Sequence, residues 1–185
     1  MKLIVGLGNP DPNFDGTRHN VGFATIEVLA AANNLDWQQK DKFKSSVAEG
    51  VLDGEKVILL KPRTYYNLSG DAVLAVKQFY KLENPDILIL HDELALPFGI
   101  IRSRLGGADA GNNGVKSIIS AIGEDFARIR IGIANEHTTN QDAADFVLGH
   151  FNHDENKALV EVKKHALLMA EAFIRGEFDH TTIEV

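Results

Sequence analysis

The sequence predicts a single α/β domain over residues 1–185. Two apolar runs, Leu3–Val5 and Ile87–Leu90, have the composition of buried strands, and the second is uninterrupted, as in strands covered on both faces. Amphipathic helical patterns stand between and after such runs, so strands and helices alternate along the chain. With 185 residues, 44% of them hydrophobic, the chain can bury one well-packed core and has little length for a second domain.

The composition excludes several classes of protein. Cysteine is absent, which rules out a thiol nucleophile, a thiolate metal site and disulfides. The sequence has no signal-like leader and no stretch of membrane-spanning length, so we expect a cytoplasmic protein. The net charge is −7, but residues 136–185 hold ten of the 26 acidic and only four of the 19 basic side chains. The rest of the chain is almost neutral and can still present a basic face to a nucleic acid.

The first strand ends in a glycine turn. Gly6 and Gly8 interrupt the apolar run and place Asn9 at the carboxyl end of the strand, where open α/β sheets bind ligands. A dinucleotide-binding GxGxxG motif does not fit here. Asp11 and Pro12 begin a loop where that motif requires a glycine and a helix.

His19 comes directly before a helical pattern that opens at Asn20. Its imidazole is therefore expected near a helix N-terminus, where a neutral ring can act as a general base. The alternative is that His19, with Arg18 and Asn20 beside it, only caps the helix. These residues alone do not separate the two interpretations.

A hairpin and a second helix are predicted next. The arms of the hairpin are Ser46–Leu52 and Lys56–Leu60, joined at Asp53-Gly54, a pair suited to a tight primed turn, and Pro62 ends the second arm. A polar and aromatic segment then leads into the helix and places Asn67 at an element boundary. The apolar face expected for this helix consists of Ala72, Val73, Val76, Phe79 and Tyr80.

Three polar residues, His91, Asp92 and Glu93, follow the apolar run that ends at Leu90. In an α/β sheet this end lies beside the end of the first strand, so Asp92 is predicted to reach His19 and orient its ring. The plain alternative is an acidic cap after a strand. A metal phosphohydrolase of the His-Asp type would carry this pair on a helix with further ligands, which the sequence lacks.

Another strand, Ile100–Arg104, leads into a glycine-rich loop over residues 106–114 and then a helix. The helix start offers free N–H groups to a phosphate or a carbonyl, although Val115 stands where a P-loop requires lysine. Phe126–Ile133 alternates as a half-buried strand does. Basic residues here are candidates for one basic face, with an ordinary solvated surface as the alternative: Arg102, Arg104, Lys116, Arg128 and Arg130.

The C-terminal part is predicted to contain a polar loop over 134–141, a long helix from Asp154 with a packed apolar face, and a frayed tail over Glu177–Val185. His150 and His153 are three residues apart but lack a third ligand, so no metal site is expected. We expect no other cofactor.

Five motifs, in their order and spacing, resemble those of bacterial peptidyl-tRNA hydrolases: GLGNP at 6–10, TRHNVGF at 17–23, KPRTYYNLSG at 61–70, HDEL at 91–94 and GNNG at 111–114. The resemblance covers essentially the whole chain. It implies a three-layer domain with a mixed, largely parallel sheet flanked by helices. It also implies hydrolysis, without a metal, of the ester that joins a peptide to the 3′ end of tRNA.

The resemblance further implies roles for individual residues. His19 takes the proton from water and Asp92 holds the ring, while Asn9 helps to separate peptidyl-tRNA from aminoacyl-tRNA with a free amine. Asn67 and Asn113 match substrate-binding amides, which can hydrogen-bond the peptide and the acyl carbonyl. Stacking on the tRNA end and contacts with its phosphates are expected from the remaining matched or basic positions: Phe14, Tyr65, Arg102, Arg104, Arg128 and Arg130.

The sequence departs from the family pattern around the same site. Asp11, Phe14, Tyr66 and Asn112 stand where the family usually has glycine, tyrosine, methionine and histidine. Asp109 adds a negative charge to a loop that is normally richer in glycine. A slower enzyme is therefore expected.

The expected protein is a monomer that binds peptidyl-tRNA and needs neither a membrane nor an obligatory protein partner. Two alternatives stay open: a tRNA acceptor-end binding protein with weakened catalysis, and a hydrolase or phosphorylase of related architecture that acts on a small metabolite. Release of free tRNA from N-blocked aminoacyl-tRNA separates an enzyme from a binder. A dependence on salt and on the tRNA portion separates it from a small-metabolite enzyme.

Overall fold

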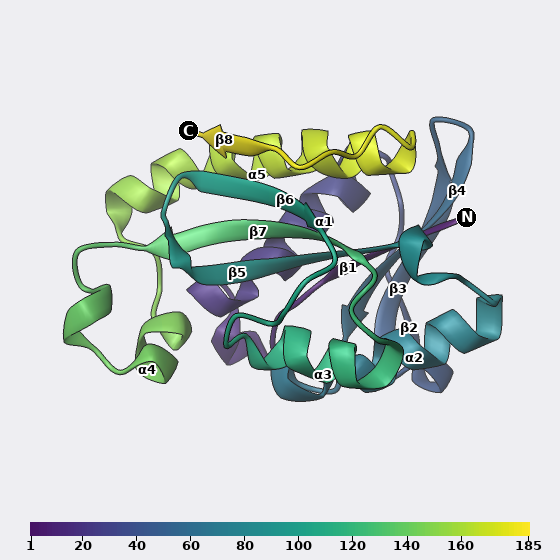
Figure 1. Cartoon of the computed structure of the whole chain (residues 1–185), viewed down its shortest axis with the longest axis horizontal. Helices are drawn as coiled ribbons and strands as arrows, with labels where there is room; N and C mark the ends of the chain where they lie inside the picture. The colour runs from purple at the N-terminus through teal and green to yellow at the C-terminus, as the bar shows by residue number, and fades with distance from the viewer.

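The computed structural model describes residues 1–185 and consists of one eight-stranded sheet between two layers of helices (Figure 1). The strands are β1 (Lys2–Gly6), β2 (Gln38–Lys40), β3 (Ser45–Leu52), β4 (Glu55–Pro62), β5 (Ile87–Pro97), β6 (Ile100–Leu105), β7 (Ala127–Ala134) and β8 (Thr182–Glu184). The helices are α1 (Val21–Ala32), α2 (Ser69–Tyr80), α3 (Asn113–Ile122), α4 (Ala143–Leu148) and α5 (His153–Ile174).

The sheet is mixed and has the strand order β2-β3-β4-β1-β5-β7-β6-β8. The four central strands, β4, β1, β5 and β7, run parallel to one another, whereas the pairings on both flanks are antiparallel. The predicted α/β fold with a mixed sheet is thus confirmed, with parallel pairing confined to the centre. The predicted hairpin is β3 and β4, and the φ angles of 50° at Asp53 and 80° at Gly54 are of the sign that a primed turn requires.

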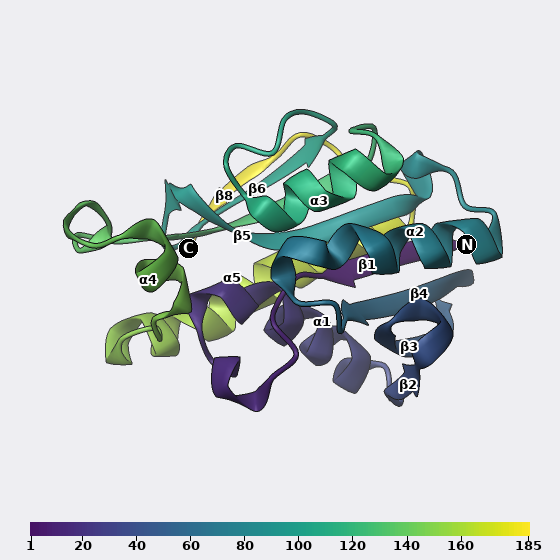
Figure 2. The ribbon, with the colours of Figure 1, turned by 90° about the horizontal axis from the view of Figure 1, so that it is seen from below.

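Two hydrophobic cores cover the two faces of the sheet. Helices α1 and α5 lie on one face, and α2 and α3 lie on the other (Figure 2). Alternate residues of a strand point to opposite faces. In β1, Ile4 belongs to the core under α1 and α5, whereas Leu3 and Val5 belong to the core under α2 and α3. The central strands are continuously apolar because both of their faces are covered.

Helix α1 begins very close to the end of β1. A Cβ atom at Gly22 would lie 2.6 Å from the amide nitrogen and 2.7 Å from the carbonyl oxygen of Leu7, so only glycine permits this approach. The amide of Phe23 donates to that same carbonyl oxygen, at 3.1 Å. This packing puts His19, just before the helix, at the carboxyl edge of the sheet.

Strand β5 is longer than the predicted run Ile87–Leu90. It continues to Pro97 and pairs with β7 through Glu93 and, after a register shift, again at Pro97, but its pairing with β1 ends where Leu90 lies opposite Gly6. The residues after Leu90 therefore extend past the end of β1 while they are still held in the sheet by β7. Asp92 is presented on a rigid strand beside the glycine turn.

Helix α5 confirms the long predicted helix. Its buried face includes Val162, Ala166, Met169 and Phe173, at the predicted spacings of three and four residues. A capping box begins the helix: the side chain of Asn152 accepts from the amide of Glu155, whose carboxylate accepts from the amide of Asn152. No helix in the structure, α5 included, combines the length and apolarity needed to cross a membrane.

Three expectations from the sequence are wrong. The strand around Arg128 is not half-buried, because β7 is buried on both faces from Ala127 to Ile133. The C-terminal tail is not simply frayed: β8 pairs antiparallel with β6 and covers the edge that β6 would otherwise expose. Phe79 does not join the core, since it is 57% exposed and the ammonium group of Lys42 lies 3.8 Å from its ring centroid.

Candidate active site

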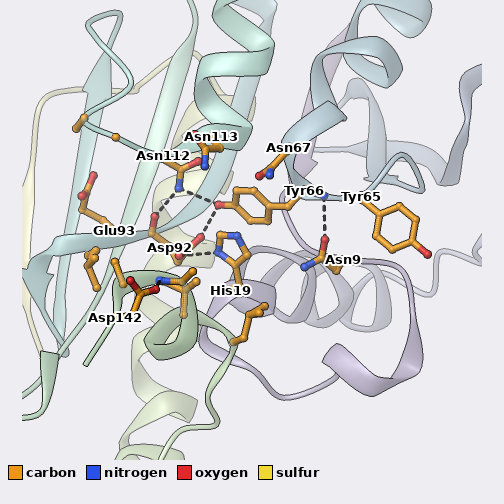
Figure 3. Close-up of a pocket in the computed structure, with 17 residues that line it drawn as sticks. Asn9, His19, Tyr65, Tyr66, Asn67, Asp92, Glu93, Asn112, Asn113 and Asp142 are labelled. Carbon is orange, nitrogen blue, oxygen red and sulfur yellow. Dashed lines mark hydrogen bonds and ion pairs between the residues drawn. The ribbon is translucent and has the colours of Figure 1, made fainter. Parts of the chain in front are cut away.

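A cavity of about 640 Å³ opens at the carboxyl edge of the central strands (Figure 3). Its walls come from the turn after β1, the residues before α1, the segment before α2, β5, the start of α3 and helix α4. Six residues predicted from the sequence line this cavity: Asn9, His19, Tyr65, Asn67, Asp92 and Asn113. Folding therefore brings together polar side chains that lie far apart in the chain.

Asn9 is held in one orientation by hydrogen bonds. The backbone amide of Asn9 donates to Asn20 Oδ1 at 2.9 Å, and Asn20 Nδ2 donates to the backbone carbonyl oxygen of Asn9 at 3.0 Å. The amide of Tyr66 donates to Asn9 Oδ1 at 2.9 Å. Because this hydrogen bond fixes which way the side-chain amide points, Asn9 presents its Nδ2 donor to the cavity (Figure 3). Asn20 stands at the start of α1 but makes no side-chain cap, since its amide binds Asn9 instead.

His19 and Asp92 form the expected contact. His19 Nδ1 lies 2.9 Å from Asp92 Oδ2, and the Asp92 side chain is only 3% exposed. A carboxylate only accepts hydrogen bonds, so it fixes the proton of the neutral imidazole on Nδ1. Nε2 is then a free acceptor on the cavity side of the ring. The imidazole therefore does not act as a cap for α1.

Tyr66 packs against both members of this pair. Its ring stacks on His19 with a centroid distance of 3.4 Å and an interplanar angle of 12°. Its hydroxyl donates to Asp92 Oδ1 and accepts from Asn112 Nδ2 at 2.9 Å. Burial, together with the charge of Asp92 and the hydrogen bond to it, raises the pKa of Tyr66 well above its usual value. The hydroxyl is therefore protonated at neutral pH.

The main chain of β5 is also tied to the site. His91 Nδ1 donates to the carbonyl oxygen of Asp92 at 2.7 Å, and Asn112 Nδ2 donates to the same oxygen at 3.1 Å. Burial lowers the pKa of His91, which is fully buried on the face of the sheet under α2 and α3. His91 is therefore a neutral supporting group behind the cavity.

The other predicted substrate-binding residues lie around the cavity mouth or outside it. Asn67 and Asn113 are exposed and line the cavity, and Tyr65 also lines it with 55% of its surface exposed. In Figure 3 the two asparagines lie above the ring of Tyr66, and Tyr65 lies to one side of Asn9. Phe14, in the short helical turn Pro12–Phe14, is half-buried and does not line the cavity.

The four predicted arginines share one face of the sheet. Arg102 lies opposite Arg130 and Arg104 lies opposite Arg128 in the antiparallel pairing of β6 and β7, so all four side chains emerge on the same side. Arg104 is exposed and Arg102 is half-buried, with its Nε donating to Thr182 at 3.1 Å. The face contains a fixed acid as well, since Arg130 Nε donates to Glu93 at 3.0 Å.

Arg128 does not belong to an exposed basic face. It is 2% exposed, and its guanidinium donates to the carbonyl oxygens of Gly106, Gly107 and Ala108 at 2.9 to 3.1 Å. Burial and the neighbouring guanidinium groups lower its pKa from the usual arginine value. Alternation along the strand suggested exposure, but the glycine-rich loop folds over this position. Arg128 holds that loop in place.

Sequence reasoning missed one wall of the cavity. Helix α4 and its N-cap residue contribute Asp142, Ala143 and Val147 to the lining, among others. The sequence feature that could have indicated this helix is Asp142 before an apolar segment. In the structure the Asp142 side chain caps α4 and accepts from the amide of Ala144. Six residues are too few to show a helical period. The roles of Tyr66 and Asn112 as mutual hydrogen-bond partners were missed as well.

The structure contains no group of three or more histidine, aspartate and glutamate side chains placed to hold a metal ion. His150 instead lies in a single antiparallel bridge with Thr17, beside Gly16. His153 begins α5.

The fold and the cavity together define an α/β enzyme with a histidine–aspartate pair at the carboxyl edge of its sheet. Comparison with known proteins narrows this class. The family described as peptidyl-tRNA hydrolase matches residues 3–185, and the chain belongs to this family. A peptidyl-tRNA hydrolase of Rickettsia africae is 44% identical over 161 residues, which cover 87% of this chain and 86% of the relative.

Solved structures agree with this assignment. A crystal structure of peptidyl-tRNA hydrolase in complex with N-propanol superimposes with a TM-score of 0.90 at 37% identity, covering 96% of this chain and 90% of that one. A purine nucleoside phosphorylase from Toxoplasma gondii has a TM-score of 0.55 over 95% of this chain and 91% of its own, at 9% identity. The second likeness shows a shared fold alone.

Proposed function

We propose that this chain hydrolyses the ester between a peptide, or an N-blocked aminoacyl group, and the 3′ end of tRNA, with His19 as general base. The observation that carries the proposal is the 2.9 Å hydrogen bond between His19 Nδ1 and Asp92, which leaves Nε2 facing a cavity lined by side-chain amides. Membership of the peptidyl-tRNA hydrolase family supports the substrate class.

In the proposed reaction, Nε2 of His19 takes a proton from water while the water oxygen attacks the acyl carbonyl carbon. Asp92 keeps Nδ1 protonated and stabilises the imidazolium that forms. The tetrahedral intermediate then loses the ribose oxygen, and the imidazolium returns its proton to that oxygen. Free tRNA and the peptide acid are the products, and the steps use only water and side chains.

Amide side chains are suited to the acyl and peptide groups. Asn67 and Asn113 offer neutral donors and acceptors at the cavity mouth, where they can hydrogen-bond the peptide and the oxygen that becomes negative in the intermediate. The hydrogen bond from the amide of Tyr66 to Oδ1 fixes the orientation of the Asn9 side chain and turns its Nδ2 donor toward the substrate. A blocked amine brings a carbonyl that can accept from this donor. A free ammonium group has no acceptor, so Asn9 favours peptidyl-tRNA over aminoacyl-tRNA.

The tRNA end is expected to bind along the rim of the cavity. The exposed ring of Tyr65 is available for stacking on a base, and we propose the same for Phe14 farther out. Arg102 and Arg104 are proposed to contact phosphates, because they are the more accessible members of the four-arginine face. Arg128 and Arg130 support this face from within.

We also propose that the enzyme acts as a monomer, without an obligatory protein partner, in the cytoplasm, where translation produces peptidyl-tRNA. All groups used in the proposed reaction come from one chain. Sedimentation equilibrium, with activity measured over the same range of concentrations, tests the oligomeric state.

The test of the function is a steady-state assay of free tRNA released from N-acetylaminoacyl-tRNA by the wild type and by His19→Ala. We expect the wild type to turn over and the variant to lose at least about a hundredfold in kcat, as for loss of a general base. The variant should still bind the substrate. A His19→Ala variant with near-normal turnover contradicts the role of His19, and a wild type that only retains the substrate indicates a tRNA-end binding protein.

A further inference from the structure

We propose that Tyr66 is a positioning residue for the hydrolysis, which holds Asp92 and His19 in their working geometry through its hydroxyl and its ring. This inference rests on the proposed function of the site. It gives a positioning role to a side chain that, by the resemblance, stands at the position of a methionine.

The ring of Tyr66 fixes one face of the imidazole. The two rings are nearly parallel, 12° apart, and their centroids are 3.4 Å apart. Tyr66 itself is 2% exposed, and the Cα of Gly114 lies against it so closely that an added Cβ would be 2.5 Å from the edge of the ring. The tyrosine ring is therefore tightly packed, and it limits rotation of His19 away from Asp92.

The hydroxyl fixes the carboxylate. Asp92 Oδ2 accepts from His19 Nδ1, and Asp92 Oδ1 accepts from the Tyr66 hydroxyl (Figure 3). Both oxygens are thus engaged, and rotation of the carboxylate would break both hydrogen bonds. If the hydroxyl were absent, Oδ1 would be left without a partner on a side chain that is 3% exposed.

The direction of the hydroxyl proton follows from its neighbours. The amide of Val115 donates to Asn112 Oδ1 at 3.0 Å, so the orientation of the Asn112 side chain is known. Its Nδ2 donates to the Tyr66 oxygen at 2.9 Å. Since Asn112 Nδ2 only donates and a carboxylate only accepts, the hydroxyl proton points to Asp92. A directed chain runs from Asn112 through Tyr66 to Asp92.

The chain links two positions that depart from the family pattern. In the resemblance described for the sequence, Tyr66 stands at the position of a methionine and Asn112 at that of a histidine, and these two residues are hydrogen-bonded to each other. Methionine could not donate to Asp92. Tyr66 and Asn112 therefore act together, and their hydrogen bonds hold the carboxylate of Asp92 in place.

The decisive variant is Tyr66→Phe, which keeps the stacked ring and removes only the hydroxyl. We expect kcat for N-acetylaminoacyl-tRNA to fall about tenfold, the effect of losing a hydrogen bond to a charged group, while KM changes less than about twofold. Tyr80→Phe is the matched control: Tyr80 is half-buried at the end of α2, its hydroxyl lies 3.4 Å from Glu49 of β3, and neither residue lines the cavity. Its kcat and KM should equal those of the wild type.

A double-mutant cycle tests whether the hydroxyl acts through Asp92. In an Asp92→Asn background, Tyr66→Phe should lower kcat by less than about twofold, because the group that the hydroxyl positions is already altered. An undiminished tenfold effect in that background, or an unchanged kcat in the wild-type background, overturns the proposal. If His19→Ala retains normal turnover, the proposed function fails instead, and the two failures are thus distinct.

A second variant guards against a folding defect in Tyr66→Phe. Asn112→Ser keeps an oxygen that can cap α3 but removes the amide donor to the Tyr66 hydroxyl and to the carbonyl oxygen of Asp92. It leaves both Tyr66 and Asp92 in place. We expect a smaller loss of kcat, about threefold, with KM again unchanged. A rise in KM with full kcat would assign Asn112 to substrate binding and overturn its place in the chain.

Discussion

Arg18 and Glu155 form a bidentate ion pair that joins the segment before α1 to the first turn of α5. Their two nitrogen–oxygen contacts are 3.1 and 2.7 Å, and the two residues are only 4% and 7% exposed. The guanidinium also donates to the carbonyl oxygen of Ile133 and lies 4.6 and 4.8 Å from the ring centroids of Phe146 and Phe151. The residue next to Arg18 is the proposed base, so this pair anchors His19 from outside the cavity.

Loss of the charge on Glu155 should destabilise the protein. Glu155→Gln leaves the Arg18 guanidinium buried without a counter-ion, and we expect the free energy of unfolding to fall by about 3 kcal/mol. Glutamine still serves in a capping box, so the helix cap is retained. Urea unfolding at pH 7 measures the change. Glu161→Gln is the control, because its pair with Lys164 is exposed and should contribute less than about 0.5 kcal/mol.

The ion pair between Arg18 and Glu155 should also make the stability of the protein depend on pH. Burial opposes ionisation of Glu155, but hydrogen bonds from Arg18, from the amide of Asn152 and from Asn135 outweigh it and lower the pKa of Glu155. A lowered folded-state pKa contributes stability that is present above the unfolded value of about 4.5 and is lost as the pH falls. Between pH 6 and 3, Glu155→Gln should therefore lose less stability than the wild type. Parallel curves would show that the pair is not linked to acid unfolding.

The contact between the predicted base and its partner could be anticipated because each residue is fixed by a local pattern. The apolar run before His91 places Asp92 near a strand end, and the helical period after Asn20 places His19 at a helix start. Parallel neighbours bring these ends together. No such rule places Tyr66, because its stacking on His19 depends on how the segment before α2 crosses the edge of the sheet.

Other features depend on which parts of the chain cover each strand. Arg128 alternates with apolar residues as a surface residue would, but a loop twenty residues earlier supplies three carbonyl oxygens to it. Strand β8 has three residues and becomes a strand only because β6 offers an open edge. Both features depend on contacts between segments far apart in the chain, and local hydrophobic periodicity does not predict such contacts.

Gly114 gives a test of the contact between α3 and Tyr66. A Cβ at this position would lie 2.5 Å from Tyr66 Cε1 and 2.9 Å from Leu7 Cδ1. Alanine should therefore displace the ring, lower kcat about tenfold and cost about 1–3 kcal/mol in stability, even though alanine favours helix over glycine. Ser120→Ala, on the exposed side of the same helix, is the control. A Gly114→Ala variant that is more stable and fully active would show that the ring has room to move.

Arg104 tests the proposed contact with tRNA phosphates. If Arg104 neutralises one phosphate, Arg104→Gln should raise KM, leave kcat unchanged and reduce the slope of log KM against log salt by about 0.7–0.9. Measurement of KM from 50 to 300 mM salt, roughly the range over which such effects are seen, gives the slope. Arg175→Gln is the control, since Arg175 pairs with Glu177 and Asp53. Equal slopes for Arg104→Gln and the wild type would remove Arg104 from the tRNA contact surface.

Tyr66 should make the folded protein sensitive to alkali. Burial and Asp92 raise the pKa of Tyr66 well above 10, whereas the unfolded chain releases this proton near pH 10. Above that pH the folded state holds more protons than the unfolded state, so the free energy of unfolding falls as the pH rises, by up to about 1.4 kcal/mol per pH unit. Tyr66→Phe removes this contribution, and the unfolding free energy of the variant should decline less steeply between pH 9.5 and 11 than that of the wild type.

Burial and Glu49 also raise the pKa of Tyr80, so Tyr80→Phe measures what a less buried tyrosine contributes. A wild-type slope retained in Tyr66→Phe and lost in Tyr80→Phe would place the alkaline sensitivity at the surface of α2 and not in the active site.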